Sequence, residues 1–458
     1  MKRFLAFTAL FAITVTAAGC GGGGGSSSDS GSSNATAEQY GGCSEDGATA
    51  QSPEGLPLKC SMNSAGELMW DVWAGGQISG EAKANATGSL NAIFGGECDA
   101  NGPKKYTTGV GDENNWDYIV PLGEMNFGHV TPVDHFYMYY PKDADQRAPG
   151  SFSITSPADG AIIDVQDFRK MNNWPYPDFR IVITHSCDLY TVLIHIGALV
   201  GAAARAEAEM PADGHWVGNI PVKAGEIIGD RSQAEKFDFS TFATDAKADL
   251  INPLSYLAGE SWKPYTANPL DYFPADVTKA YEAKMIRTTK PVGGTIFYDI
   301  DGTAQGVWFV KDTNGYAGLQ GQRSVRSDSG FNSRGYWDTH LAIAPHHVDT
   351  TMFVYSMGDF GGQPVQFVTK GNIDPSTIKA GDAPVVVDLL PFKYATPDGQ
   401  AMDIFSPVKD YKLAPQADIA GSLALQVNAD GSMTVEKRPG KTAASFTGFT
   451  ADALTYVR

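Results

Sequence analysis

The chain has 458 residues and is acidic, with 34 Lys and Arg against 52 Asp and Glu and a formal net charge of −18. A surface of this sign repels phosphate backbones and anionic lipid headgroups, which excludes nucleic acid as an expected partner. Beyond the first twenty residues, no segment approaches the roughly 18 consecutive apolar residues of a membrane-spanning helix.

Residues 1–20 predict an export signal. Lys2 and Arg3 are followed by an apolar stretch over residues 4–15, and small residues then lead to Cys20. This order resembles the bacterial lipobox, in which the cysteine is acylated and becomes the new N-terminus. The resemblance implies lipidation of Cys20 and a lipid-anchored cell-envelope protein, at the outer membrane if the cell is Gram-negative. An ordinary secretory signal with a chance cysteine is the alternative.

Residues 21–35 form a Gly/Ser run that predicts a flexible tether. Residues 36–115 are polar and Gly-rich, and we expect a small cysteine-bearing N-terminal module there. Besides Cys20 the chain has four cysteines, an even count that predicts up to two disulfides in an exported protein. Their pairing stays open among three possibilities, and a zinc site is disfavoured because no two of them form a CxxC pair. These cysteines are Cys43, Cys60, Cys98 and Cys187.

From residue 116 the pattern becomes strand-like, with short apolar runs separated by Gly, Pro and Asp turns. We expect a β-sandwich over 116–244, a connector with helical stretches over 245–290 and an all-β domain over 291–458. The predicted fold class is therefore mainly β with few helices, a peptidase-type β-sandwich followed by a second sandwich or barrel. The expected strands are 136–140, 161–165, 180–184, 191–196, 226–228, 295–300, 306–310, 339–344, 352–355, 365–369 and 385–390. Expected helices are 201–210 and 275–286, and a hairpin turn is expected at 428–431.

One strand–turn–strand segment carries chemistry. Residues 181–197 read I-V-I-T-H-S-C-D-L-Y-T-V-L-I-H-I-G, with His185 and His195 near the strand ends. The segment resembles the V-V-I-x-H-G-x-G-x-x-T-x-Y-A-H-L hairpin of the lysostaphin-type zinc metallopeptidases. Residues 222–229 resemble that family's V-x-x-G-x-x-I-G turn, and residues 156–163 its opening strand. The similarity covers residues 125–242, a duplicated-hybrid-motif domain in the family.

The resemblance implies a zinc ion with an open coordination position and a catalytic histidine beside it. Carried over to this sequence, it assigns His195 and His185 as catalytic residues and His129, Asp134 and Asp238 as metal ligands. The spacing from His129 to Asp134 is one residue longer than the family's H-x-x-x-D, and His135 is a substitute at the family spacing from Thr131. The late H-x-H is replaced by Lys236 and Asp238.

This departure leaves two functions open. The first is a degenerate peptidase-like domain, in which the histidines serve structural hydrogen bonds and the domain binds cell-wall peptide or a protein ligand. The second is an active metal-dependent endopeptidase on peptidoglycan or extracellular peptides, with zinc held by an altered ligand set. The loss of the late H-x-H motif favours the first, so zinc is at most an optional cofactor and catalysis stays uncertain.

Smaller signals suggest other activities. Residues 295–303 match the strand and D-x-D-G-T signature of haloacid-dehalogenase-like phosphatases at Asp299 and Asp301, which would require helices to follow. A β-turn is the simpler interpretation. Gly306-Val-Trp308 resembles the G-x-W of small ligand-binding barrels, and His346–His347 is a candidate metal-binding pair or a solvated loop. Trp308, Tyr336 and Trp337 are candidates for a binding face or for the core.

Overall fold

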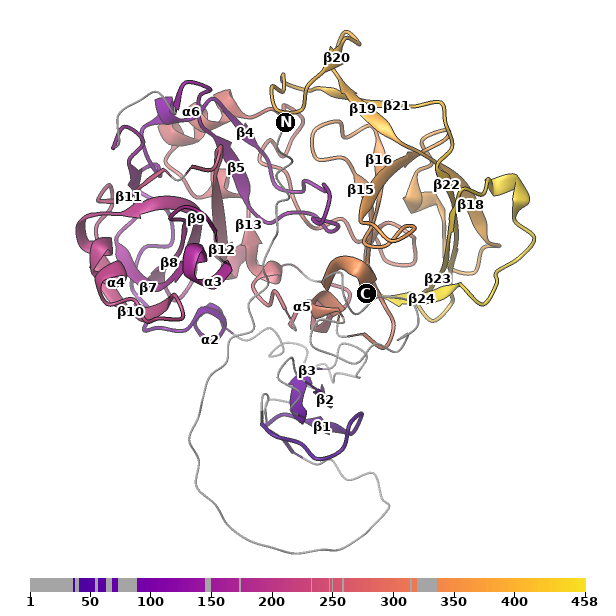
Figure 1. Ribbon diagram of the computed structural model, residues 1–458, viewed down its shortest axis with the longest axis horizontal. Coiled ribbons are helices and arrows are strands. Elements are labelled where there is room, and N and C mark those ends of the chain that lie inside the picture. Colours follow the sequence, from indigo (N-terminus) through magenta and orange to yellow (C-terminus); the bar gives the residue numbers. More distant parts are fainter. Residues whose placement is uncertain are drawn as a thin grey trace, which may run out of the picture.

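The computed structural model describes the chain from residue 36 onward, with gaps. The described residues are 36–37, 41–53, 57–62, 68–72, 89–144, 150–172, 174–231, 233–246, 248, 250–257, 259–313, 315–318 and 336–458. The predicted signal, Cys20 and the predicted tether over residues 21–35 all lie outside them. The chain is mainly β, as predicted, with a large sheet on one side, a barrel on the other and a small sheet below (Figure 1). In the described part, no helix is both long and apolar enough to cross a membrane.

The small sheet contains β1 (Thr49–Gln51), β2 (Pro57–Met62) and β3 (Leu68–Val72), paired antiparallel. A disulfide joins Cys43 to Cys60 of β2. Leu58 of β2 is fully buried in a cluster with Leu254. Within the described residues, this sheet is therefore stabilised by the disulfide and by a small apolar cluster with Leu254 and Leu257.

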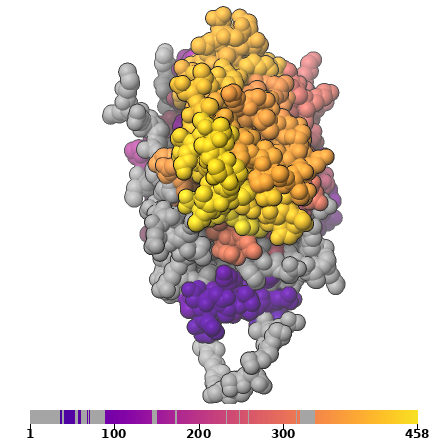
Figure 2. Space-filling view, turned by 90° about the vertical axis from the view of Figure 1, so that its right-hand side faces the viewer, coloured from indigo at the N-terminus to yellow at the C-terminus, as the bar shows by residue number. Residues whose placement is uncertain are grey.

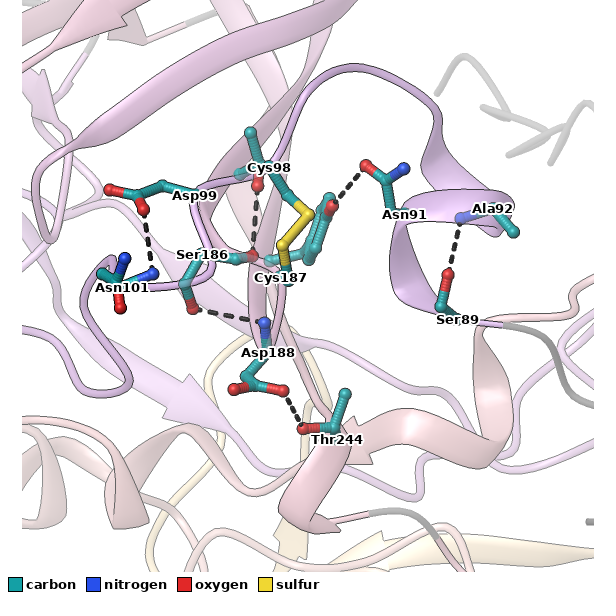
Figure 3. The surroundings of a disulfide bond; sticks show 12 residues. Ser89, Asn91, Ala92, Cys98, Asp99, Asn101, Ser186, Cys187, Asp188 and Thr244 are labelled. Atoms are coloured by element: carbon teal, nitrogen blue, oxygen red, sulfur yellow. Dashed lines mark hydrogen bonds between the residues drawn. A yellow bond between two sulfur atoms is a disulfide. The ribbon is translucent and has the colours of Figure 1, made fainter.

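The second disulfide joins Cys98 to Cys187, in the turn between two strands of the large sheet (Figure 3). The Cys187 N–H also donates to the Asp99 carbonyl at 3.1 Å. Just before Cys98 lies the short helix α2 (Leu90–Phe94), whose first turn is capped by the Ser89 hydroxyl. Residues 90–98 are therefore fixed to the large sheet.

The large sheet has ten strands, and its main path runs β10-β7-β8-β9-β12-β5-β4. Strand β11 pairs with β6 and β9, and β13 pairs with β12. Its central strands are buried along almost their whole length, and β8 and β9 accordingly carry runs of Val, Ile and Leu. The strands are β4 (Tyr118–Val120), β5 (Phe136–Tyr139), β6 (Ile154–Thr155), β7 (Gly160–Asp167), β8 (Phe179–Ser186), β9 (Leu189–Leu199), β10 (His215–Val222), β11 (Ile227–Arg231), β12 (Lys236–Ala243) and β13 (Thr266–Ala267).

Helices are short and serve as connections. The two predicted helical stretches are present, the first as η3 (Gly201–Ala203) followed by α4 (Ala204–Ala208) and the second as α6 (Ala275–Lys284). Among the described residues, the other α-helices are α3 (Phe168–Asn172) and α5 (Leu254–Leu257). The remaining 3-10 turns in this part of the chain are η1 (Glu113–Asn115), η4 (Thr244–Ala246), η5 (Lys263–Tyr265), η6 (Pro269–Asp271), η7 (Gly315–Ala317), η10 (Tyr336–Thr339), η11 (Pro375–Thr377) and η12 (Ala443–Ser445).

The C-terminal strands close into a barrel of order β14-β15-β16-β17-β18-β22-β23-β24. Residues of this C-terminal part, orange to yellow, cover most of the upper face of the molecule in Figure 2. Trp308 and Tyr456 are fully buried in its core, where the Trp308 indole donates to the Ala304 carbonyl at 3.0 Å. A three-stranded sheet, β20-β19-β21, is inserted between β18 and β22. The strands are β14 (Gly306–Val310), β15 (His340–Pro345), β16 (Phe353–Met357), β17 (Val365–Thr369), β18 (Val385–Leu390), β19 (Phe392–Ala395), β20 (Ala401–Met402), β21 (Lys412–Pro415), β22 (Gly421–Val427), β23 (Met433–Pro439) and β24 (Leu454–Val457). The predicted turn at 428–431 joins β22 to β23.

The predicted strand over 295–300 is wrong. These residues lie outside the strands because local bonds occupy their polar groups: the Asp299 carboxylate accepts the Val307 N–H at 2.8 Å, and Gln305 donates to the Tyr298 carbonyl at 2.9 Å. A strand of an antiparallel barrel then follows rather than a helix. The phosphatase interpretation of Asp299 and Asp301 therefore loses the fold that it requires.

Barrel and large sheet share one cluster of buried apolar residues, besides the separate core that each has of its own. One cluster of buried residues contains Val133 and Tyr137 from the sheet region together with Phe309, Ala342 and Val354 from the barrel. No polar linker therefore separates the two halves at this contact.

Candidate functional site

Asp238 is the centre of the candidate site. It lies on β12, opposite Tyr137 of β5 on one side and Ile194 of β9 on the other. Its side chain is buried, with 6% of the residue surface exposed, and Oδ1 has no hydrogen-bond partner. Within the described residues, the ion pairs of Asp238 are those to His135 and His195. A buried carboxylate with an unsatisfied oxygen is costly, so the position calls for an explanation.

His195 approaches Asp238 from β9. Its Nε2 lies 3.5 Å from Asp238 Oδ2, and its Nδ1 lies 2.8 Å from Asp178 Oδ2. His195 has a φ of +70°, at a register shift between β8 and β9. Such a conformation in a non-glycine residue is strained and is enriched at functional sites. Desolvation alone would lower the pKa of His195, but the carboxylates of Asp238 and Asp178 outweigh it and raise the pKa.

His135, the residue directly before β5, approaches the same carboxylate. Its Nε2 lies 3.6 Å from Asp238 Oδ2 and has no hydrogen-bond partner, while its Nδ1 lies 3.0 Å from Asp134 Oδ1. Each of the two histidines therefore has Nδ1 beside its own carboxylate and Nε2 directed toward Asp238. A carboxylate at Nδ1 fixes the imidazole tautomer and leaves the Nε2 lone pair available.

His129 and Asp134, the other predicted ligands, have different partners. His129 Nε2 lies 3.3 Å from the Tyr137 hydroxyl, and burial lowers the pKa of His129 to about 3. Asp134 Oδ2 accepts from the Trp262 indole at 3.0 Å and lies 3.5 Å from Lys263 Nζ. The structure therefore does not bring His129 and Asp134 into contact with Asp238.

His185, the other predicted catalytic histidine, belongs to a separate buried network. Its Nδ1 lies 3.0 Å from the Asp159 carbonyl and its Nε2 3.0 Å from the Thr191 hydroxyl. The Tyr106 ring contacts it edge-on, with the centroids 5.6 Å apart. Burial lowers the pKa of His185 to about 4. Both ring nitrogens are thus engaged within the core.

Lys236 replaces the first histidine of the family's late H-x-H motif. It shares a face of β12 with Asp238, two residues on. Its Nζ lies 3.3 Å from the centre of the Tyr137 ring, a cation–π contact. An ammonium held in this way is not an equivalent of the imidazole that a peptidase uses to position water.

The structure therefore does not assemble His129, Asp134 and Asp238 into the predicted set of zinc ligands. In the part of the chain that the structure describes, no three His, Cys, Asp or Glu side chains form a ready-made metal-holding group. An imidazole bonded to a tyrosine hydroxyl and a carboxylate bonded to Trp262 would both have to abandon their partners. No step of hydrolysis through this set can be derived.

Two aromatic side chains lie beside His195. The Trp174 ring stacks over the His195 ring with centroids 6.0 Å apart, and Tyr176 meets Trp174 edge-on at 5.6 Å. Both are half-buried, and the residue between them, Pro175, is exposed. We call Trp174 and Tyr176 the aromatic rim. It gives the surface beside the candidate site the flat apolar character that suits peptide or sugar contacts.

The smaller sequence signals have structural roles. His346 and His347 are buried, and His346 Nδ1 accepts the Val348 and Asp349 N–H groups. The predicted solvated loop at this pair is therefore wrong. Trp308 is a core residue with the Arg458 guanidinium 4.1 Å over its ring, and Trp337 is half-buried.

Sequence reasoning did not single out Asp178, Trp262 and Lys263. Asp178 directly precedes β8, and its neighbour Phe179 pairs with Ile196, next to His195. The hairpin register was the signal that could have found Asp178. Trp262 and Lys263 come from the connector over 245–290, and no local pattern indicates that this segment reaches Asp134.

No protein-family model and no curated protein matches the chain. Among solved structures, the NMR solution structure of lysostaphin is similar at a TM-score of 0.21 and 10% sequence identity, over 76% of this chain and 98% of lysostaphin. A similarity this weak carries no argument about activity.

Proposed function

We propose that the protein is a cell-envelope lipoprotein whose large-sheet domain binds cell-wall peptide or a protein ligand without hydrolysing it. The observation that carries this proposal is that predicted site residues make structural contacts instead. The predicted catalytic residue His185 and the predicted metal ligand His129 are hydrogen-bonded within the fold, and Lys236 lies in place of a catalytic histidine. A β-rich domain in which these residues do not take part in peptide hydrolysis can still bind a ligand on its surface.

The aromatic rim supports a peptide-like ligand. Trp174 stacks on the His195 ring and Tyr176 meets Trp174 edge-on, so an extended chain can pack against the half-buried rings beside His195. The net charge of −18 disfavours acidic ligands. Cell-wall peptides that carry free amino groups satisfy both conditions.

Co-sedimentation with purified, insoluble peptidoglycan tests this function. We expect the full chain to sediment with the cell wall, and we expect a Trp174→Ala/Tyr176→Ala double variant to lose most of that binding. Phe405→Ala, at a residue 65% exposed on the barrel side, is the control and should bind like the unaltered chain. Equal binding by all three proteins would contradict the proposal.

The same incubation examines the alternative, a metal-dependent endopeptidase with an altered ligand set. Under the binding proposal, no soluble cell-wall fragments accumulate, with or without added zinc. Release of fragments that a chelator abolishes would establish hydrolysis instead.

Anchoring through Cys20 is the second part of the proposal, supported by the lipobox resemblance. We expect the protein to partition with membranes and to incorporate labelled fatty acid, and Cys20→Ser to abolish both. Membrane association of Cys20→Ser equal to that of the unaltered chain would overturn the lipid anchor.

A further inference from the structure

We infer that Phe127 is a second contact residue for the peptide ligand, and that Gln366 of the barrel positions it. The ligand is the cell-wall peptide of the proposed function, so this inference rests on that proposal. It gives the C-terminal barrel a part in ligand binding, through a turn of the large-sheet domain.

Phe127 lies at the tip of a tight turn. Asn126 and His129 pair across this turn: the Asn126 N–H donates to the His129 carbonyl at 3.0 Å, and the His129 N–H donates to the Asn126 carbonyl at 2.9 Å. Phe127 is 75% exposed, the highest fraction among the large apolar residues that the structure describes. Its ring therefore contributes little to the core.

The backbone conformation makes a phenylalanine unusual at this position. Phe127 has a φ of +48°, in the left-handed region, where tight turns favour Gly, Asn or Asp. Of the other four described non-glycine residues with positive φ, three are Asp or Asn, and the fourth is His195. A bulky side chain in this conformation is strained, and such strain concentrates at ligand-binding sites. Phe127 thus costs stability without joining the core, which indicates a function at the surface.

Gln366 of β17 holds the turn in place. Its Oε1 accepts the Phe127 N–H at 2.9 Å, and its Nε2 donates to the Phe127 carbonyl at 3.0 Å. The same Nε2 donates to the Ser356 hydroxyl of β16 at 3.1 Å, which fixes the amide. A Cβ on Gly128 would lie 3.7 Å from the Trp337 ring, so the turn also packs close to that indole. A contact residue that is fixed before the ligand arrives loses less conformational entropy on binding.

The turn leads directly into the candidate site. The ring of His129, two residues after Phe127, has its centre 6.4 Å from that of His135. His135 Nε2 lies 3.6 Å from Asp238, and Asp238 lies 3.5 Å from Nε2 of His195, on which the aromatic rim packs. Phe127 and the aromatic rim are therefore at the two ends of one run of contacts, and the three histidines between them are partly exposed. This continuity selects the occupant, because an extended peptide on the rim can reach Phe127 along the run.

Sedimentation with purified, insoluble peptidoglycan, over a series of cell-wall concentrations, tests the contact. We expect Phe127→Asn to weaken binding of the full chain about tenfold, as the loss of an aromatic interface residue does. Asparagine tolerates the left-handed backbone, so the turn should persist without the ring. Phe127→Trp keeps an aromatic ring and should bind within about threefold of the unaltered chain.

Phe405→Ala is the matched control for this series. Phe405 lies in the loop between β20 and β21 and is 65% exposed, so its removal also deletes an exposed phenyl ring. It should bind like the unaltered chain. Because the Phe127 contact is apolar, we also expect the tenfold ratio between Phe127→Asn and the unaltered chain to be the same at low and at high salt, with both values on the order of ten.

The positioning role of Gln366 needs a separate variant. Gln366→Ala should weaken binding about fivefold in the unaltered chain and add nothing in the Phe127→Asn background, because the glutamine acts only through the turn. A general structural role would reduce binding in both backgrounds. Urea unfolding checks the fold: Phe127→Asn should not lower the midpoint, since it relieves strain at an exposed position. Phe127→Gly replaces Phe127→Asn if the latter does not fold.

The outcomes separate this inference from the proposed function. If the unaltered chain sediments with the cell wall and folded Phe127→Asn binds equally well, this inference is overturned and the proposed function stands. Additive losses in the Gln366→Ala/Phe127→Asn double variant would overturn the positioning role. No sedimentation of the unaltered chain would overturn both proposals together.

Discussion

His185 is a buried histidine that should make the stability of this protein depend on pH. Its pKa is lowered to about 4 by burial, against an ordinary value near 6.5 in the unfolded chain. The unfolded state therefore takes up a proton first as the pH falls. The stabilisation is complete above about pH 6.5 and is lost as the pH falls toward 4, by a total on the order of 3 kcal/mol.

His185→Gln should remove this pH dependence. Glutamine can still donate to the Asp159 carbonyl but does not titrate, so the free energy of unfolding should change by about 3 kcal/mol less between pH 6.5 and pH 4 than in the unaltered chain. Urea unfolding at several pH values measures it. An unchanged slope would show that His185 is not buried in its neutral form.

His215 provides a control, because its pKa is shifted in the opposite direction from that of His185. Its hydrogen bond to the Asp164 carboxylate raises its pKa, so its stabilisation is present below about pH 6.5 and fades as the pH rises through the raised value. His215→Gln should therefore lower stability mainly on the acid side, by about 1 kcal/mol or less for this partly exposed pair.

Lys263 is the second residue with a large expected effect. Its buried Nζ lies 3.0 Å from Glu260 and 3.5 Å from Asp134. Lys263→Met would leave the buried Asp134 and the half-buried Glu260 carboxylates without this cation, at a cost of roughly 3–5 kcal/mol in the free energy of unfolding. The exposed pair of Lys223 with Asp159 provides the control, Lys223→Met, for which we expect less than about 1 kcal/mol. Equal losses in urea unfolding would contradict the assignment.

At the scale of elements, the two disulfides should differ in what they stabilise. The Cys98–Cys187 bond spans 89 residues and fixes the segment around α2 to the β8–β9 turn, whereas Cys43–Cys60 spans 17 and lies in the small sheet. Loop-closure entropy predicts about 4–5 kcal/mol for the first and about 3 kcal/mol for the second.

We therefore expect the Cys98→Ser/Cys187→Ser variant to lower the midpoint of the main unfolding transition. The Cys43→Ser/Cys60→Ser variant should leave that midpoint unchanged and increase only the proteolysis of residues 41–72. Limited proteolysis beside urea unfolding separates the two effects. A main-transition loss in the second variant as large as in the first would show that the small sheet is integral to the core.

At the scale of the whole molecule, the shared core predicts that barrel and large sheet unfold together. Phe309 lies on β14 in the cluster that also contains Val133 and Tyr137. Phe309→Ala should cost about 3–5 kcal/mol and lower the midpoint of one common calorimetric transition. Phe405→Ala, at an exposed ring, should not move it. Two separate transitions, with only one shifted, would show that the halves fold independently.

The sequence by itself determined much of this protein. Apolar runs between Gly, Pro and Asp turns predicted the mainly β class and most strands of both halves, because alternation and turn chemistry are local properties. The lipobox pattern and the replacement of a late H-x-H by Lys236 and Asp238 are also readable from the chain alone. The segment at 295–300 failed because bonds from Asp299 and Gln305, which are not periodic, override its strand propensity.

Only the tertiary structure decided which histidines meet Asp238. Adjacent residues at a strand point to opposite sides, so the sequence could not distinguish Asp134 from His135, and a shift of one residue exchanges them. The fold directs His135 Nε2 toward Asp238 and places Asp134 against Trp262, which comes from a segment more than a hundred residues away. Side-chain direction at a strand end depends on register and on distant contacts, and neither is written in a local motif.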